Sequence, residues 1–166
     1  MGALVSFELT RQLRAQQLQL PLHLFASAHR APQIENPDPP IHNLADKGFI
    51  AELNKLNGTS QRVLENDELM QMMLPIIRAD FAVCETYTYR QEPPFACAIS
   101  AFCGLADPNI TRDYMEAWHL QTSKTFKLTM FEGDHFYLFH HQDSLLQMIL
   151  ADLARPLDHL SKVLHS

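Results

Sequence analysis

The sequence has few glycines and cysteines, no run of basic residues and no long apolar stretch. Lys and Arg total 13 against 19 Asp and Glu, which gives a formal net charge of -6. Because phosphate binding needs clustered cations, we expect no nucleic-acid partner. No apolar stretch approaches the roughly 18–20 residues that span a bilayer, so we expect no transmembrane helix and no membrane partner. The start of the chain lacks the basic region of a secretory signal.

Cysteine content indicates a reducing compartment. The three cysteines, Cys84, Cys97 and Cys103, form no C-x-x-C pair, and their odd number argues against a disulfide framework. Hydrophobic residues make up 46% of the chain and charged residues 19%, which is a globular composition. We therefore expect a cytoplasmic protein, with the length of 166 residues sufficient for a single domain.

Apolar and polar residues follow the periodicities of strands and helices. Short apolar runs predict buried strands, since the strands of a parallel sheet are apolar on both faces. Apolar residues at three- and four-residue steps predict helices. The order of these elements is typical of a parallel α/β sheet with flanking helices. The expected strands cover residues 20–28, 97–103 and 126–131, and the expected helices cover residues 1–17, 46–56, 67–87, 111–121 and 143–153.

The helices within residues 41–89 interrupt the strand–helix alternation and are interpreted as a helical insertion. A turn is expected between them at Asn57-Gly58, and Pro75 is expected to kink or divide the second helix. Thr111 is expected to cap the next helix, because its hydroxyl can accept a hydrogen bond from the first turn.

Two polar residues follow strands in this scheme, Asp107 after the second and His135 after the third. Ligands of open parallel sheets bind at the carboxyl ends of the strands. An aspartate and a histidine on adjacent loops can pair, with the carboxylate fixing the imidazole tautomer for acid–base catalysis. The alternative is that Asp107 merely starts a turn before Pro108 and His135 is a surface loop residue.

A nucleophile for such a pair is missing from the sequence. Glycine occurs only at positions 2, 48, 58, 104 and 133, and no two of them enclose a serine in G-x-S-x-G. Ser27 and Ser100 lie within expected strands, and the cysteines have no neighbour in sequence that would lower a thiol pKa. However, Met1-Gly2-Ala3-Leu4 is similar to the second half of a nucleophile elbow, whose serine would directly precede Met1.

Several segments together resemble the type II thioesterases, the external editing enzymes of nonribosomal peptide and polyketide synthesis in the α/β-hydrolase superfamily. The family's elbow is typically GHSMGA followed by L-x-x-F-E-L-x-R-x-L, which MGALVSFELTRQL resembles from the Met onward. The resemblance covers almost the whole chain. Its other segments are Leu24 to Pro32, Pro40 to His42, Leu69 to Tyr89, Gly104 to Trp118 and Phe131 to Phe136.

The resemblance implies a partial α/β-hydrolase fold, the C-terminal half of a mainly parallel sheet, as a single incomplete domain over residues 1–166. By position Asp107 is the triad acid, His135 the triad base and residues 41–89 the lid over the acyl site. The backbone N–H of Met1 would belong to the oxyanion hole. The chain departs from the family at Asp134, where a second glycine is common before the histidine.

The implied reaction is the hydrolysis of an acyl thioester carried on the phosphopantetheine arm of a carrier protein, in secondary metabolite biosynthesis. No cofactor and no metal are expected. Because the elbow serine is absent from the sequence, this chain is expected to be inactive alone. Two alternatives stay open: a non-catalytic remnant that binds a carrier protein or an acyl chain, and one half of a split thioesterase.

Overall fold

The computed structural model describes residues 1–56, 63 and 66–164, and side chains up to residue 154. The chain divides into two compact units. Met1 and Glu35–Tyr89 form the first unit, and Gly2–Ile34 with Arg90–Ser166 form the second. The turn expected at Asn57-Gly58 lies outside the described residues. Within the described part of the chain, no helix is both long and apolar enough to cross a membrane.

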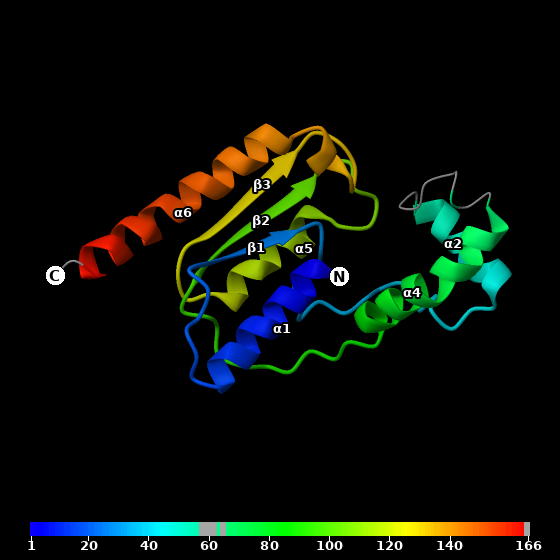
Figure 1. The fold of residues 1–166 in the computed structure, drawn as a ribbon, viewed down its shortest axis with the longest axis horizontal. Coiled ribbons are helices and arrows are strands. Elements are labelled where there is room, and N and C mark those ends of the chain that lie inside the picture. Colours follow the sequence, from blue (N-terminus) through cyan, green and yellow to red (C-terminus); the bar gives the residue numbers. More distant parts are fainter. Residues whose placement is uncertain (57–62, 64–65, 165–166) are drawn as a thin grey trace. The chain divides into compact units, whose positions relative to one another are not determined.

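The second unit contains a three-stranded parallel sheet in the order β1-β2-β3 (Figure 1). Its strands are β1 (His23–Ser27), β2 (Ala98–Gly104) and β3 (Phe126–Phe131). In the register of the sheet Ser27 pairs with Phe102, and Gly104 pairs with Phe131. The central strand is buried along almost its whole length, which explains its apolar sequence. The predicted α/β fold with a parallel sheet and flanking helices is confirmed.

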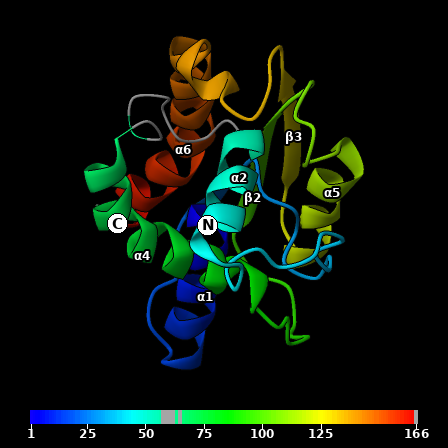
Figure 2. The ribbon, with the colours of Figure 1, turned by 90° about the vertical axis from the view of Figure 1, so that its right-hand side faces the viewer.

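Helices cover both faces of this sheet (Figures 1 and 2). One face carries α1 (Gly2–Ala15), α5 (Arg112–Glu116) and the 3₁₀ helix η1 (Ala117–Gln121). The other face carries α6 (Gln142–Leu164). A second short 3₁₀ helix, η2 (Tyr137–Phe139), follows β3. This is a three-layer arrangement, in which the strands are covered from both sides.

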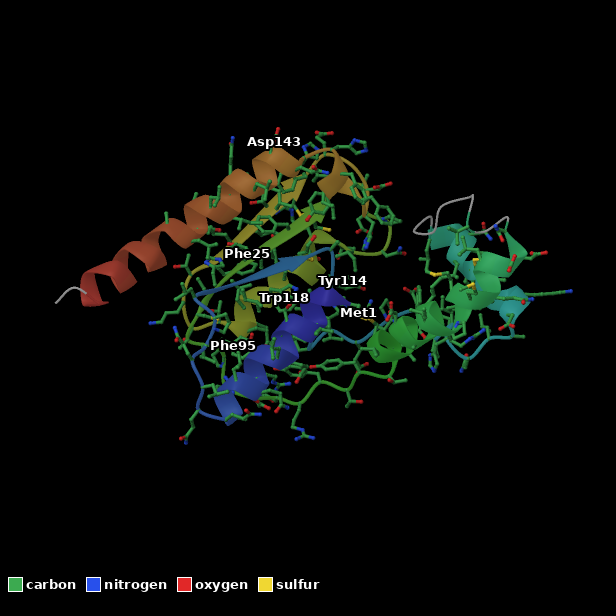
Figure 3. The ribbon with its side chains drawn as sticks, viewed as in Figure 1. Met1, Phe25, Phe95, Tyr114, Trp118 and Asp143 are labelled. Atoms are coloured by element: carbon green, nitrogen blue, oxygen red, sulfur yellow. The ribbon has the colours of Figure 1, made fainter. Side chains whose placement is uncertain are left out.

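Aromatic residues form the core beneath α1 and α5 (Figure 3). The Phe7 ring packs against Phe95 at 5.1 Å and edge-on against Trp118 at 5.8 Å between ring centroids. The indole nitrogen of Trp118 donates a hydrogen bond of 2.8 Å to the carbonyl of His29. Trp118 therefore connects this core to the loop that follows β1.

The core beneath α6 contains both apolar and polar residues. Phe102, Phe131 and Tyr137 form an apolar cluster against which Leu145 and Ile149 pack. At the other end of the strands, His23, Ser100 and Asp152 form a buried polar cluster, joined by Lys127, which pairs with Asp152.

The segments by which the chain leaves and re-enters the second unit are both held at η1. The Gln33 side chain donates to the carbonyl of Ala117 and accepts from the Gln121 amide, each at 2.7 Å. The backbone N–H of Phe95 donates to the carbonyl of Gln121 at 2.8 Å. Gln121 therefore contacts both the segment by which the chain leaves the second unit and the segment by which it returns.

Two arginines of helix α1 also bind the segment by which the chain returns to the second unit. Arg11 donates to the carbonyl of Arg90, and the Arg14 guanidinium contacts the Glu92 carboxylate at 2.6 Å. The Arg14 side chain lies over the Phe95 ring at 5.0 Å. The arginines lower the pKa of Glu92, with the hydrogen bond from Arg14 as the largest cause.

Several element ends differ from the sequence expectations. Helix α1 ends at Ala15 rather than at residue 17, because Gln17 adopts a left-handed φ of 57° and Leu18 N–H closes on the carbonyl of Leu13 at 2.9 Å. The helix expected over 111–121 is one α-helical turn followed by η1, and Thr111 caps it as predicted. Helix α6 runs to Leu164, well past the expected residue 153.

The first unit contains the helices α2 (Asp46–Leu56) and α4 (Asp67–Glu85). Helix α4 continues through Pro75, so of the two expected outcomes the division is wrong and the kink stays a prediction. The reason is tertiary packing, because residues on both sides of Pro75 bury against the same cluster around Phe49 and Leu53. These residues are Met70, Leu74, Ile77 and Phe81.

Candidate active site

Asp107 and His135, the two residues expected at the carboxyl edge of the sheet, are brought together by the structure. Asp107 lies three residues after β2, and His135 lies four residues after β3. The His135 Nδ1 atom is 2.7 Å from the Asp107 Oδ2 atom. The carboxylate is fully buried, whereas 44% of the His135 side chain is exposed. A buried acid thus holds an imidazole that solvent and a ligand can reach.

The Asp107 carboxylate is held from both of its oxygens. Its Oδ1 atom accepts hydrogen bonds from the backbone N–H groups of Asn109 at 2.9 Å and Ile110 at 3.1 Å. Burial by itself would raise the pKa of Asp107, but the hydrogen bonds from His135 and from these two N–H groups outweigh it and lower the pKa. The acid is therefore ionised and fixed in orientation.

This arrangement sets the tautomer of His135. A carboxylate accepts, so the Nδ1 atom carries the proton that lies between the two groups. The Nε2 atom is then the basic nitrogen, and it can take a proton from a hydroxyl group. If it does, the neighbouring carboxylate stabilises the resulting imidazolium.

Backbone hydrogen bonds join the loop that carries Asp107 to the turn that carries His135. The N–H of Leu105 donates to the carbonyl of Phe131 at 2.8 Å, and the N–H of Ala106 donates to the carbonyl of Gly133 at 2.9 Å. Gly133 has a φ of 111°, a conformation that residues with a side chain rarely adopt. The separation of the acid and the base is thus fixed by main-chain contacts.

Asp134, at the position where the family commonly has glycine, stabilises the turn through hydrogen bonds. Its Oδ1 atom accepts a hydrogen bond of 2.8 Å from the backbone N–H of Phe136. Its carbonyl accepts another from the N–H of Tyr137 at 3.1 Å. The extra carboxylate beside the base therefore has a local role in shaping the turn.

Three further polar residues, Ser27, His29 and Tyr137, lie on the same edge, and of these only Ser27 was considered from the sequence, as part of an expected strand. His29 follows β1, and burial is the main reason that its pKa falls to about 4, so it is neutral near pH 7. Ser27, the last residue of β1, lies with its hydroxyl 2.7 Å from that of Tyr137, whose ring is fully buried. Ser27 and His29 could have been identified from their position in the sequence, because they lie at the end of a predicted strand.

The other candidate groups take structural positions. Ser100 is buried in the polar cluster under α6. Burial raises the pKa of the Cys97 thiol, and that of Cys103 to about 12, so both thiols stay protonated. Met1 directly precedes α1, and its place in an oxyanion hole stays a prediction. Among the described residues no group of three or more His, Cys, Asp or Glu side chains could hold a metal ion.

Comparison with known families decides the assignment. A family model described as "Thioesterase domain" matches residues 1–153. The chain belongs to the thioesterase domain family. This confirms the predicted resemblance.

Individual relatives agree with this membership. The chain is 47% identical to the linear gramicidin dehydrogenase LgrE of Brevibacillus parabrevis over 92% of its own length and 59% of that protein. It is 38% identical to the type II thioesterase BorB from the borrelidin biosynthetic cluster, with a TM-score of 0.80 over 91% of this chain and 61% of BorB.

A third relative is YbtT, a type II thioesterase from the yersiniabactin NRPS/PKS biosynthetic pathway. The identity is 32% and the TM-score 0.82, over 93% of this chain and 63% of YbtT. The chain therefore spans about 60% of the length of each of these three relatives.

Proposed function

We propose that this thioesterase supplies the acid and the base for hydrolysing acyl thioesters on the phosphopantetheine arms of carrier proteins. In this role it removes misplaced acyl groups from nonribosomal peptide or polyketide synthases in the cytoplasm. The observation that carries the proposal is the 2.7 Å contact between His135 Nδ1 and the buried Asp107 carboxylate at the carboxyl edge of a parallel sheet. Similarity to type II thioesterases of biosynthetic pathways supports the substrate class.

The reaction proceeds through an acyl-enzyme. A serine hydroxyl attacks the thioester carbonyl carbon while His135 Nε2 takes its proton, and Asp107 stabilises the imidazolium. The carbon–sulfur bond then breaks, and the thiolate of the arm leaves with that proton. In the second half His135 takes a proton from water as the hydroxide adds to the acyl carbon, and the bond to the serine oxygen then breaks as His135 returns that proton to the serine, which releases the free acid.

The serine is proposed to lie directly before Met1 in a longer protein, at the end of a Gly-His-Ser segment. The relatives are longer than this chain by enough to contain such a segment together with further strands. The backbone N–H of Met1 would then face the developing oxyanion. Residues 41–89 would form the lid over the acyl group, and the 166-residue chain would not turn over substrate by itself.

The name of LgrE gives that protein a dehydrogenase activity. We do not transfer that activity to this chain, because the matched family and the Asp107–His135 pair both favour acyl transfer to water.

The test compares this chain with a version that carries an upstream segment ending in Gly-His-Ser. Both are given an acylated carrier protein and a soluble acyl thioester, and thiol release is measured. We expect hydrolysis by the longer protein only. In the longer protein Asp107→Asn should lower kcat by about 10⁴-fold, and His135→Ala should abolish most of the activity. A His135→Ala variant with the parent rate would overturn the proposed role of the base.

Other results favour the alternatives. Binding of an acylated carrier protein by the short chain, with no turnover by the longer one, indicates a binding module. Co-purification of a separate protein that restores hydrolysis indicates one half of a split enzyme. Soluble acyl thioesters separate loss of chemistry from loss of carrier-protein docking, because they need no docking surface.

A further inference from the structure

Gly104, the last residue of β2, lies against the turn that carries His135. A Cβ atom built on Gly104 would lie 2.5 Å from the carbonyl oxygen of Gly133 and 2.8 Å from the carbonyl carbon of Asp134. It would come closer still to the carbonyl oxygen of Asp134. Real Cβ atoms essentially never approach other atoms to less than 3.0 Å. All three obstructing atoms belong to the backbone, so no side-chain rotation relieves the overlap.

Glycine is required at position 104 because the surrounding backbone leaves no space for a Cβ atom. Of the described glycines only Gly133 has a positive φ, so Gly104 is not needed for a left-handed backbone. Its missing side chain lets the end of β2 and the turn after β3 approach each other closely. The backbone bond from Ala106 to Gly133 forms across this approach at 2.9 Å.

The two chain segments that meet at Gly104 are those that carry the acid and the base. Asp107 follows Gly104 by three residues, and its N–H points back to the Gly104 carbonyl at 3.4 Å. His135 follows directly on Asp134, whose carbonyl is the nearest obstruction. A displacement of the turn therefore changes the distance between Asp107 Oδ2 and His135 Nδ1.

We propose that Gly104 is a positioning residue for the Asp107–His135 pair. Its lack of a side chain sets the depth at which the turn sits on the sheet edge, and this depth brings the imidazole within hydrogen-bond distance of the carboxylate. The mechanistic meaning rests on the proposed function, but the geometric claim concerns the pair alone and can be tested without substrate.

The experiment uses the whole chain with Gly104→Ala and, as a matched control, Gly48→Ala. At Gly48 the same added methyl group meets only the Leu44 side chain, its Cβ at 3.6 Å and its Cδ1 at 3.9 Å, which are ordinary contacts. Proton NMR reads the hydrogen-bonded proton on His135 Nδ1, which His135→Ala identifies by its loss. We expect this downfield signal to disappear or move strongly upfield in Gly104→Ala and to stay unchanged in Gly48→Ala. Amide signals of Ile99 and Ala101 report whether β2 is still folded.

A folded Gly104→Ala variant that keeps the wild-type signal would refute the proposal. If this variant does not fold, Gly133→Ala provides the second test, because it disturbs the same turn through its φ of 111° and its added Cβ lies 3.6 Å from the nearest atoms, those of Tyr137. The signal should again be lost while β2 stays intact, and its retention would contradict the proposal.

The result separates this inference from the proposed function. In the longer, serine-containing protein, a misplaced pair should lower kcat by about 10²-fold with little change in KM. Loss of the NMR signal in Gly104→Ala, combined with no thioester hydrolysis by the parent protein, would leave the positioning role standing and contradict only the proposed function.

Discussion

The hydroxyl of Ser100 donates a hydrogen bond of 2.6 Å to the carboxylate of Asp152, which joins the central strand to α6. The same hydroxyl oxygen lies 2.9 Å from His23 Nε2 and accepts from it, since its own proton is directed to the acid. Burial is the main reason that the pKa of His23 is lowered. A neutral histidine, a serine and an aspartate therefore form a directed chain beneath α6, and this chain is separate from the candidate active site.

Ser100→Ala should lower the free energy of unfolding by about 1–3 kcal/mol, because it leaves the His23 N–H and the Asp152 oxygen buried without their partner. Urea denaturation followed by circular dichroism measures the change. Ser123→Ala is the control, since Ser123 bonds the Phe95 carbonyl at 3.0 Å but is exposed, and its loss should have a much smaller effect. Equal effects of the two substitutions would contradict the role of the buried cluster.

Stability should fall in acid through Asp107. The pKa of this carboxyl is lower in the folded chain than in an unfolded one, where it is about 3.9. The resulting stabilisation is complete above the unfolded value and is lost as the pH falls through the folded value. Unfolding free energies measured as the pH is lowered from about 6 to below the unfolded value should decline less steeply in Asp107→Asn. Asp38→Asn, at an exposed position, should keep the parent slope.

Ala28→Gly should stabilise the protein. Ala28 has a φ of 45° at the end of β1, where its N–H donates to the carbonyl of Phe102 at 2.8 Å. A left-handed residue with a Cβ is strained by about 1–2 kcal/mol, so glycine should gain about 1 kcal/mol after its larger entropy in the unfolded chain is subtracted. Thermal unfolding measures this gain, and a decrease in the melting temperature would show that the Ala28 methyl group contributes more by packing than it costs in strain.

Trp118→Phe should destabilise the chain by about 1–3 kcal/mol beyond the loss of buried area, because the carbonyl of His29 loses its donor. Chemical denaturation gives the total change. Tyr114→Phe on the preceding helix α5 removes a hydroxyl from a half-buried ring and should change stability by less than about 0.5 kcal/mol. A similar change in the two variants would mean that the Trp118–His29 bond contributes nothing measurable.

The sheet could be predicted from the sequence because β2 is buried on both faces and its sequence is therefore a continuous apolar run. Asp107 and His135 could be placed together because the carboxyl ends of parallel strands share one edge. The family resemblance then gave each of them a role. The helix boundaries were harder to predict, because Gln17 takes a left-handed conformation that sequence statistics assign mainly to glycine.

Contacts between distant segments could not be predicted. Helix α4 continues through Pro75 because Met70 and Phe81, on either side of the proline, pack in the same apolar cluster. The close approach at Gly104 depends on a turn about thirty residues further along the chain, and its sequence carries no sign of that contact. The Ser27–Tyr137 bond likewise joins residues separated by 110 positions.

The anchoring of both ends of residues 35–89 at η1 has an evolutionary consequence. Gln121 bonds Gln33 before the inserted segment and Phe95 after it, so the points where the chain leaves the sheet unit and returns to it are both fixed outside that segment. The inserted segment can then lengthen, shorten or exchange its helices without altering the pairing of β1 with β2. Lineages that inherit this junction can diversify the inserted helices while the acid–base edge is passed on unchanged.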